Sequence, residues 1–146
     1  MSEEFEKRLT ALEDIEKIKK LHQKYMDLMD YLDYESVMDL FTEDATAEVR
    51  NSGVKEGKKE ISEIYLGKLA KERLKRTELH MAVHPNITVD GNTAKGTWLI
   101  YMLFCVPTPN WVQGINDCEY RKVNGVWKIS KLKFTRTMST DPSLYP

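Results

Sequence analysis

The chain has 146 residues, enough for one domain with one substantial core. Its apolar fraction of 41% is ordinary for a globular protein and argues against disorder. The formal net charge is −1, so no overall basic field favours nucleic acid or an acidic membrane surface. We therefore predict a single domain over residues 1–146, with no nucleic-acid or membrane partner.

The first residues, MSEEFEKR, are charged, and no apolar stretch approaches the length of a membrane span, so a cytoplasmic location is expected. Cys105 and Cys118 fall in predicted strands and are interpreted as reduced core residues. A basic run at residues 68–76 ends a predicted helix, and we interpret it as a solvated helix terminus.

The first half of the chain is predicted to be mainly helical. From Asp14 to Leu32, apolar residues recur at three- and four-residue spacing, which predicts a long amphipathic helix. We expect a short helix over residues 35–41, a turn and a strand within residues 42–50, a tight turn at 51–57 and a third helix over 57–73.

The second half has the pattern of strands joined by tight turns. Asp90-Gly91 and Asn124-Gly125 are strong hairpin signals within residues 84–106 and 115–134. Two prolines in VPTPNW, residues 106–111, predict a loop, and the tail 139–146 is expected to lie over the surface. Helices followed by strands indicate an α+β fold, and this order resembles the NTF2-like cone, in which helices pack on the concave face of a curved antiparallel sheet.

Several polar side chains are expected to meet between helix and sheet. Because side chains alternate along a strand, His80 and His84 are predicted to share one face. The long helix contributes Tyr25 and Asp30, and the last strand ends near Arg136. An aspartate can fix the tautomer of a histidine and stabilise its imidazolium, which makes the imidazole a general base near neutral pH. A tyrosine or arginine can stabilise developing negative charge.

Each of these residues also has a purely structural interpretation. His80 could be a core or edge residue, Asp30 could cap the next helix, and Tyr25 could belong to the core. Arg136 could form a surface ion pair of little energetic consequence. His22, at helical spacing, is interpreted as packed rather than functional.

A metal site is not favoured. The Cα atoms of His80 and His84 would lie roughly 13 Å apart in one strand, at about 3.3 Å per residue, which is too far for both imidazoles to bind one zinc ion easily. The patterns HExxH, CxxC, GxGxxG and GxSxG and the P-loop do not occur. We expect neither a metal nor a cofactor.

Three segments resemble the SnoaL-like branch of the NTF2-like superfamily: DIEKIKKLHQKYMDLMDYLDYESVMDLFTEDAT, ELHMAVHPNITVDGNTAKGTWLIY and EYRKVNGVWKISKLKFTR. The resemblance covers residues 10–138. Within the branch it is strongest to bile acid 7α-dehydratase and extends more distantly to scytalone dehydratase and hexachlorocyclohexane dehydrochlorinase. The shared pattern is specific for the fold and much less specific for the reaction.

The resemblance implies a set of active-site residues. The tyrosine, aspartate, histidine and arginine of the bile acid dehydratase fall on Tyr25, Asp30, His80 and Arg136. The dehydrochlorinase shares the Asp–His pair, in which the histidine is the base. One departure is Met102, which stands where the dehydratase has a further aspartate, so a polar group that could assist a leaving hydroxyl is missing.

The implied activity is that of a cofactor-independent, dehydratase-like lyase. His80, oriented by Asp30, would remove a proton alpha to a carbonyl, while Tyr25 and Arg136 would stabilise the enolate-like oxygen or the departing hydroxyl. The substrate would be a small to medium, apolar, hydroxylated carbonyl compound, with steroids among the candidates. The predicted substrate-binding residues are Met26, Met29, Trp98, Ile100, Met102, Phe104 and Asn116, the last as a substitute hydrogen-bonding group.

Two other functions stay open at this point. An isomerase or polyketide-cyclase-like enzyme would use the same pair without losing water, and a non-catalytic NTF2-like protein would only bind a small apolar molecule. The relatives also imply a homo-oligomer, a trimer in preference to a dimer, formed through the convex face of the sheet. The continuous apolar run LIYMLFCV fits a strand that is covered on both faces.

Overall fold

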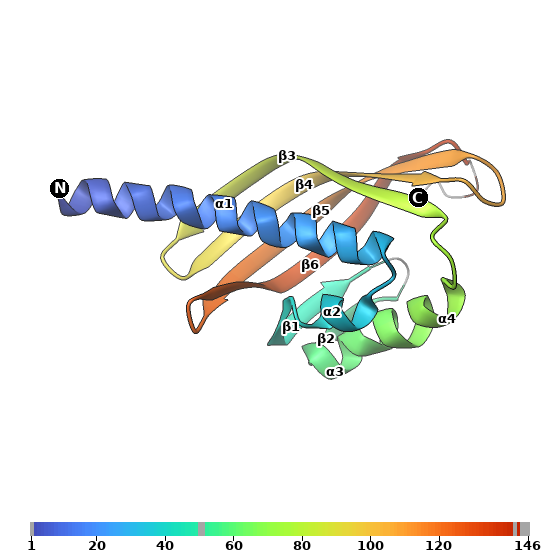
Figure 1. The fold of residues 1–146 in the computed structure, drawn as a ribbon, viewed down its shortest axis with the longest axis horizontal. Helices are drawn as coiled ribbons and strands as arrows, with labels where there is room; N and C mark the ends of the chain where they lie inside the picture. Colours follow the sequence, from blue (N-terminus) through green and yellow to red (C-terminus); the bar gives the residue numbers. More distant parts are fainter. Residues whose placement is uncertain (1, 50–51, 142, 144–146) are drawn as a thin grey trace.

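The computed structural model describes residues 2–49, 52–141 and 143. The elements in chain order are α1 (Glu3–Asp30), α2 (Tyr34–Met38), β1 (Phe41–Glu48), β2 (Val54–Glu56), α3 (Gly57–Ser62), η1 (Glu63–Leu69), α4 (Ala70–Glu72), β3 (Glu78–Asp90), β4 (Thr93–Phe104), β5 (Asn110–Val123) and β6 (Val126–Ser139). The strands form one sheet in the order β2-β1-β6-β5-β4-β3 (Figure 1).

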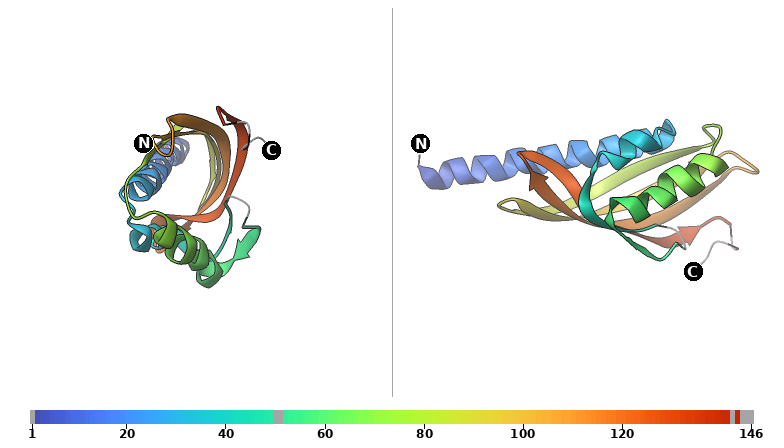
Figure 2. Two further views of the ribbon diagram at one scale, coloured as in Figure 1. Left: turned by 90° about the vertical axis from the view of Figure 1, so that its right-hand side faces the viewer. Right: turned by 90° about the horizontal axis from the view of Figure 1, so that it is seen from below.

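The sheet is curved and unclosed, and it gives the molecule the predicted α+β architecture. The long strands β3 to β6 bend around α1, while α3 to α4 lie along another side of the same concave face (Figure 2). All neighbouring pairs are antiparallel except β1 and β6, which run parallel. The sequence predicted an antiparallel sheet, and the parallel pair is the exception.

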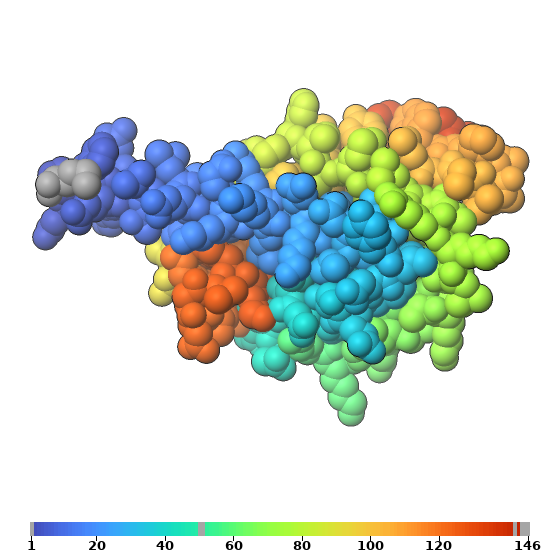
Figure 3. Space-filling view, viewed as in Figure 1, coloured from blue at the N-terminus to red at the C-terminus, as the bar shows by residue number. Residues whose placement is uncertain are grey.

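The helix α1 begins eleven residues before its predicted start at Asp14. Ser2 caps it by accepting a hydrogen bond from the backbone N–H of Phe5, and three glutamates in the first turn favour the positive end of the helix dipole. The described residues before Asp14 are exposed or half-buried and extend beyond the sheet (Figure 3). Phe5, Leu9 and Leu12 recur there at helical spacing but are exposed, so the predicted helix corresponds only to the part that packs on the sheet.

The packed part of α1 is fixed at its beginning by Asp14, which is 2% exposed. Its carboxylate accepts hydrogen bonds from Trp127 Nε1 at 2.8 Å and Lys122 Nζ at 2.9 Å, both from the β5–β6 hairpin. Burial alone would raise the pKa of Asp14, but these two donors and the lysine charge hold it below its usual value. The helix is thus tied to the hairpin through an ionised, buried carboxylate.

A second buried polar group, His22, lies deeper under the helix. Its ring stacks on Trp98 with centroids 4.5 Å apart and planes 9° apart. Nε2 accepts a hydrogen bond from Asn116 Nδ2 at 3.2 Å, so Nδ1 carries the proton and faces the Tyr120 hydroxyl at 3.0 Å. Trp98 Nε1 donates to the same hydroxyl at 2.9 Å. His22 is a packed, hydrogen-bonded core residue.

The predicted hairpins form, with a shift in one of them. Asn124 and Gly125 both have positive φ and connect β5 to β6, as a two-residue turn of this sequence requires. The turn between β3 and β4 is Gly91–Asn92, one residue later than the predicted Asp90-Gly91. The expected loop is shorter than predicted, because β5 begins at Asn110.

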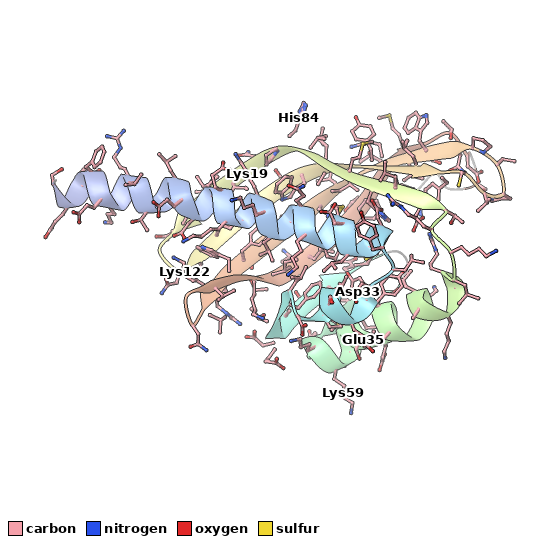
Figure 4. The ribbon with its side chains drawn as sticks, in the orientation of Figure 1. Lys19, Asp33, Glu35, Lys59, His84 and Lys122 are labelled. Carbon is pink, nitrogen blue, oxygen red and sulfur yellow. The ribbon has the colours of Figure 1, made fainter. Side chains whose placement is uncertain are left out.

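Within β3 an irregularity at residues 84–85 breaks the predicted alternation. His84 has a φ of 53° and Pro85 has no N–H to donate to the ladder, and the register shifts between Val83 and Asn86. His84 is exposed and points away from the sheet (Figure 4). Alternation alone predicted that His84 shares the inner face with His80, and this prediction was wrong.

The remaining elements depart from prediction at their ends and inside one helix. The second helix ends at Met38, because Phe41 already belongs to β1. The residues expected as a tight turn contain β2. The third helix was predicted over 57–73 and ends one residue earlier, at Glu72. Its middle, η1, is a π-helix, a wider winding that is rare in proteins.

The two cysteines also differ from one another. Cys118 is a buried β5 residue, and burial raises the pKa of its thiol to about 12. Cys105 lies beyond the end of β4 and is exposed, so its prediction as a core strand residue was wrong. No helix in the described part of the chain is long and apolar enough to cross a membrane. The last residues of the tail, 142 and 144–146, lie outside the described residues.

The buried carboxylate of Asp14 yields a stability prediction. The substitution Asp14→Asn removes the charge and replaces one of the two acceptor oxygens by an NH2 group, so either Lys122 or Trp127 loses its acceptor. We therefore expect the free energy of unfolding to fall by about 2–4 kcal/mol. Urea unfolding of wild type and variant measures the difference. The matched control is Asp27→Asn on an exposed position of the same helix, which should change stability by less than about 0.5 kcal/mol. An equal, small effect for both variants would contradict this account.

The neutral, buried His22 yields a pH prediction. Burial lowers its pKa to about 3, whereas the ordinary value is 6.5. Between these two pH values His22 is protonated in the unfolded chain and neutral in the folded chain. Its contribution to stability is therefore full above pH 6.5 and decreases as the pH falls towards 3, by up to about 1.4 kcal/mol per pH unit.

Urea unfolding at pH 7.5 and pH 5.0 checks this dependence against the variant His22→Gln. The variant should be less stable at pH 7.5 and should lose less stability than wild type on going to pH 5.0. Identical losses in the two proteins would mean that His22 is not the group responsible.

Candidate active site

A cavity of about 390 Å³ lies between α1, the inner face of β3 to β6 and the helical segment 57–72. Its walls are mostly apolar, with a few polar and charged side chains among them, as is usual for sites that bind small molecules. The lining residues are Tyr25, Met26, Met29, Val49, Lys68, Leu69, Arg73, Glu78, His80, Ile100, Met102, Phe104, Val112, Asn116, Phe134 and Arg136.

Asp30 and His80 are hydrogen-bonded to each other at one end of this cavity. Asp30 is the last residue of α1, and its Oδ1 accepts two hydrogen bonds from His80, from the backbone N at 2.9 Å and from ring Nδ1 at 2.8 Å. The side chains are 5% and 9% exposed. The carboxylate holds the proton of a neutral imidazole on Nδ1, which leaves the lone pair on Nε2.

The structural alternative for Asp30 does not fit this geometry. The residue that caps α2 is Asp33, whose Oδ1 accepts from the backbone N–H of Ser36 at 3.1 Å (Figure 4). Asp30 is turned instead toward β3. Arg76 adds a more distant charge, with Nη2 3.8 Å from Asp30 Oδ2 and its guanidinium carbon 5.3 Å from the centre of the Tyr31 ring.

Glu78 lies on the other side of the imidazole. It is the first residue of β3, on the same inner face as His80, and its Oε1 is 4.0 Å from His80 Nε2. The same carboxylate forms an ion pair with Arg73, which follows α4. His80 is therefore placed between two buried carboxylates, one on each ring nitrogen.

Tyr25 and Arg136 line the cavity from α1 and β6. The hydroxyls of Tyr25 and Tyr65 are 2.8 Å apart, and burial raises the pKa of Tyr65 well above its usual range, so Tyr65 stays protonated. Arg136 is half-buried near the end of β6. Three residues of the predicted set, Tyr25, His80 and Arg136, thus line one cavity, and the fourth, Asp30, contacts it through its hydrogen bonds to His80.

Most of the predicted substrate-binding residues also line the cavity. Met26 and Met29 do so from α1, Ile100, Met102 and Phe104 from β4, and Asn116 from β5. Trp98 does not: it lies deeper, stacked on His22, because alternation places a residue on a face of the sheet but does not tell how far along that face the cavity extends.

Asn116 is connected to the core network as well as to the cavity. It is 2% exposed, and its Nδ2 donates to His22 Nε2. This bond orients the amide. His22 does not line the cavity itself, but it is hydrogen-bonded to Asn116, which does.

Sequence reasoning missed the charged residues next to His80. The basic run at 68–76 was interpreted as a solvated helix end, but Lys68 and Arg73 line the cavity and Arg76 approaches Asp30. Glu78 was not singled out either. The available signal was its position two residues before His80, since residues i and i+2 of a strand share a face.

Comparisons with known proteins agree with this fold. The chain matches the SnoaL-like domain family over residues 10–133. An NTF2-like protein with a cystatin-like fold from Novosphingobium aromaticivorans superposes with a TM-score of 0.81 at 23% identity, covering 95% of this chain and 91% of that chain. A comparison with curated proteins finds no match.

Two further solved structures have names that refer to an activity. A hexachlorocyclohexane dehydrochlorinase, LinA-type3, from Novosphingobium barchaimii has a TM-score of 0.78 at 17% identity, covering 95% of this chain and 97% of that chain. A protein provisionally named scytalone dehydratase, from Novosphingobium aromaticivorans, has a TM-score of 0.78 at 19% identity, covering 89% and 88%. At these identities the likeness extends to the fold alone. The family match covers most of the chain and shows that it belongs to the SnoaL-like domain family.

Proposed function

We propose that this protein is a cofactor-independent lyase of the dehydratase type. The observation that carries the proposal is the hydrogen bond between Asp30 Oδ1 and His80 Nδ1. Asp30 is buried, and His80 is largely buried and lines a mostly apolar cavity. An imidazole held in this way has its lone pair on Nε2, which is the arrangement a general base needs.

The reaction we propose begins with proton removal alpha to a carbonyl. His80 Nε2 takes the proton, and Asp30 stabilises the imidazolium that forms. The negative charge moves to the carbonyl oxygen, which Tyr25 and Arg136 would stabilise. Because Tyr65 stays protonated, it can donate to Tyr25, which can donate in turn to the substrate. Return of the electrons forms a carbon–carbon double bond as the hydroxyl leaves, and with one proton it departs as water.

The cavity walls support an apolar substrate of moderate size. Met26, Met29, Ile100, Met102 and Phe104 supply apolar and polarizable surface, and about 390 Å³ is within the usual range for sites that hold a small organic molecule. The names of two structural neighbours, a scytalone dehydratase and a hexachlorocyclohexane dehydrochlorinase, both refer to eliminations, which is the reaction class proposed. The bile acid dehydratase resemblance stays a prediction.

Proton abstraction can be tested without knowing the natural substrate. In deuterated water, wild type should catalyse exchange of the alpha hydrogens of cyclic ketones, and His80→Ala should lower the exchange rate by about 100-fold or more because the base is gone. Asp30→Asn should lower it by about 10- to 100-fold because the tautomer is no longer fixed. NMR of the ketone measures exchange, and the control His84→Ala should leave it unchanged.

Unchanged exchange in His80→Ala would refute the role of His80 as base. Product mass then distinguishes the reaction class: loss of one water from a hydroxy-ketone indicates a lyase, whereas a product of unchanged mass indicates an isomerase or cyclase. Ligand binding with no exchange in wild type would favour a binding protein.

We also propose that the chain forms a homo-oligomer, with a trimer favoured. The outer face of the sheet carries large apolar side chains that are 36–50% exposed, and neighbouring strands place them side by side, since Leu79 pairs with Leu103 and Leu103 with Trp111. A contiguous exposed apolar surface of this kind is typical of a protein–protein interface. Its members are Leu79, Met81, Val83, Leu103, Trp111, Ile115 and Met138.

The outer face gives a direct prediction of mass. Light scattering after size exclusion should give about 51 kDa, three times the 17.0 kDa of one chain. Leu103→Glu should shift the mass towards one chain, because a charge on this face opposes burial. Leu74→Glu, at a position that is 81% exposed and outside this face, should not. A wild-type mass near 17 kDa would contradict the proposal.

A further inference from the structure

We infer that Glu78 forms a hydroxyl-binding subsite beside Nε2 of His80, and that the substrate is therefore a β-hydroxy carbonyl compound whose hydroxyl leaves at Glu78. The inference rests on the proposed function for the fate of that hydroxyl. The subsite itself rests on the position, burial and hydrogen bonding of Glu78.

The carboxylate of Glu78 has one satisfied and one unsatisfied oxygen. Its side chain is 6% exposed and lines the cavity. Oε1 pairs with Arg73, whereas Oε2 is buried and has no hydrogen-bond partner within the described part of the chain. A buried carboxylate oxygen without a donor is costly, and buried polar atoms are normally paired. A ligand that brings an O–H group to this place would supply the missing donor.

The neighbourhood selects a hydroxyl rather than an anion. The free oxygen Oε2 of an ionised Glu78 can only accept a hydrogen bond, so a ligand carboxylate or phosphate would bring it no donor, whereas a hydroxyl would. A hydroxyl can donate to Oε2 and at the same time accept a hydrogen bond from a protonated Nε2. The 4.0 Å between Glu78 Oε1 and His80 Nε2 is too long for a direct bond but short enough for one oxygen to contact both groups.

The strand register explains why this task would fall on Glu78. In the β3–β4 ladder His80 is opposite Met102, and Glu78 is opposite Phe104. Met102 cannot donate or accept a hydrogen bond of useful strength, so the cross-strand neighbour of His80 offers no help to a leaving group. Glu78 is the next residue along the same inner face and carries the required acceptor.

The elimination then balances on these two residues. The β-hydroxyl of the substrate donates a hydrogen bond to Glu78 Oε2. In this orientation a lone pair of the hydroxyl oxygen points toward His80. Nε2 takes the alpha proton, and the resulting imidazolium is stabilised by Asp30, which is hydrogen-bonded to Nδ1. As the carbon–oxygen bond breaks, Nε2–H returns its proton to the leaving oxygen. The products are an α,β-unsaturated carbonyl compound and water, with His80 neutral and Glu78 ionised as at the start.

The experiment separates the two half-reactions with Glu78→Leu and Glu78→Gln. The probes are a β-hydroxydecalone and the matching decalone, assayed for alpha hydrogen exchange in deuterated water and for enone formation by absorbance. Removing the acceptor in Glu78→Leu should reduce enone formation at least 100-fold while exchange on the decalone stays within about 5-fold of wild type. Glu78→Gln retains a neutral acceptor and should be intermediate. Glu43→Gln, an exposed control, should change neither rate.

A binding measurement keeps the subsite testable apart from turnover. Calorimetry should show that wild type binds the β-hydroxydecalone about 10-fold more tightly than the decalone, and that Glu78→Leu removes this preference. Circular dichroism establishes that each variant is folded. Enone formation or hydroxyl preference that is unchanged in Glu78→Leu would overturn the inference, as would an equal loss of exchange and enone formation. Failure of the proposed function differs: wild type would then show no exchange, while the Glu78-dependent binding preference would persist.

Discussion

The carboxylate of Asp30 connects the two parts of the fold between which the cavity lies. It ends α1 and accepts both the backbone and the ring N–H of His80, which belongs to β3, the edge strand of the sheet. One side chain therefore fixes the helix against the strand and sets the orientation of the imidazole. At the other end of the packed helix, Asp14 makes a comparable connection to the β5–β6 hairpin. These two buried carboxylates together fix the position of α1, which forms one wall of the cavity.

Charge around the cavity is arranged as compensated pairs beside an apolar volume. Glu78 pairs with Arg73, and Asp30 has Arg76 at 3.8 Å in addition to His80. Pairing with arginine reduces the free-energy cost of burying each carboxylate. Such buried ion pairs add little net stability to the fold. Their value lies in placing a hydrogen-bond acceptor near each ring nitrogen of His80. The deeper His22, by contrast, is kept neutral and serves to orient Asn116 and Trp98.

The fold could be predicted further than the site could. Local signals carried the prediction where they are strong: the helical period of α1 from Asp14 onward and the Asn124-Gly125 turn both correspond to the structure. The parallel β1–β6 pair joins distant residues, such as Phe41 with Ile129 and Glu48 with Lys133, which no local pattern marks. Asp30 and His80 were placed together by family resemblance. Glu78 and Arg73 were missed because a charged residue in a single sequence is most often a solvated one, and its burial depends on the tertiary fold.

The π-helical segment η1 is a place where the loss or gain of one residue, rather than an amino-acid substitution, would change the cavity wall. It winds through residues 63–69, between two α-helical stretches, and it carries Lys68 and Leu69 to the cavity wall. A π-turn holds more residues than an α-turn, so losing one residue here would let the segment rewind as an ordinary α-helix. The residues of this segment would then take different positions around the helix axis, among them those that line the cavity. An insertion or deletion in this one segment would thus change the wall of the cavity, while the Asp30–His80 pair belongs to α1 and β3 and does not depend on it.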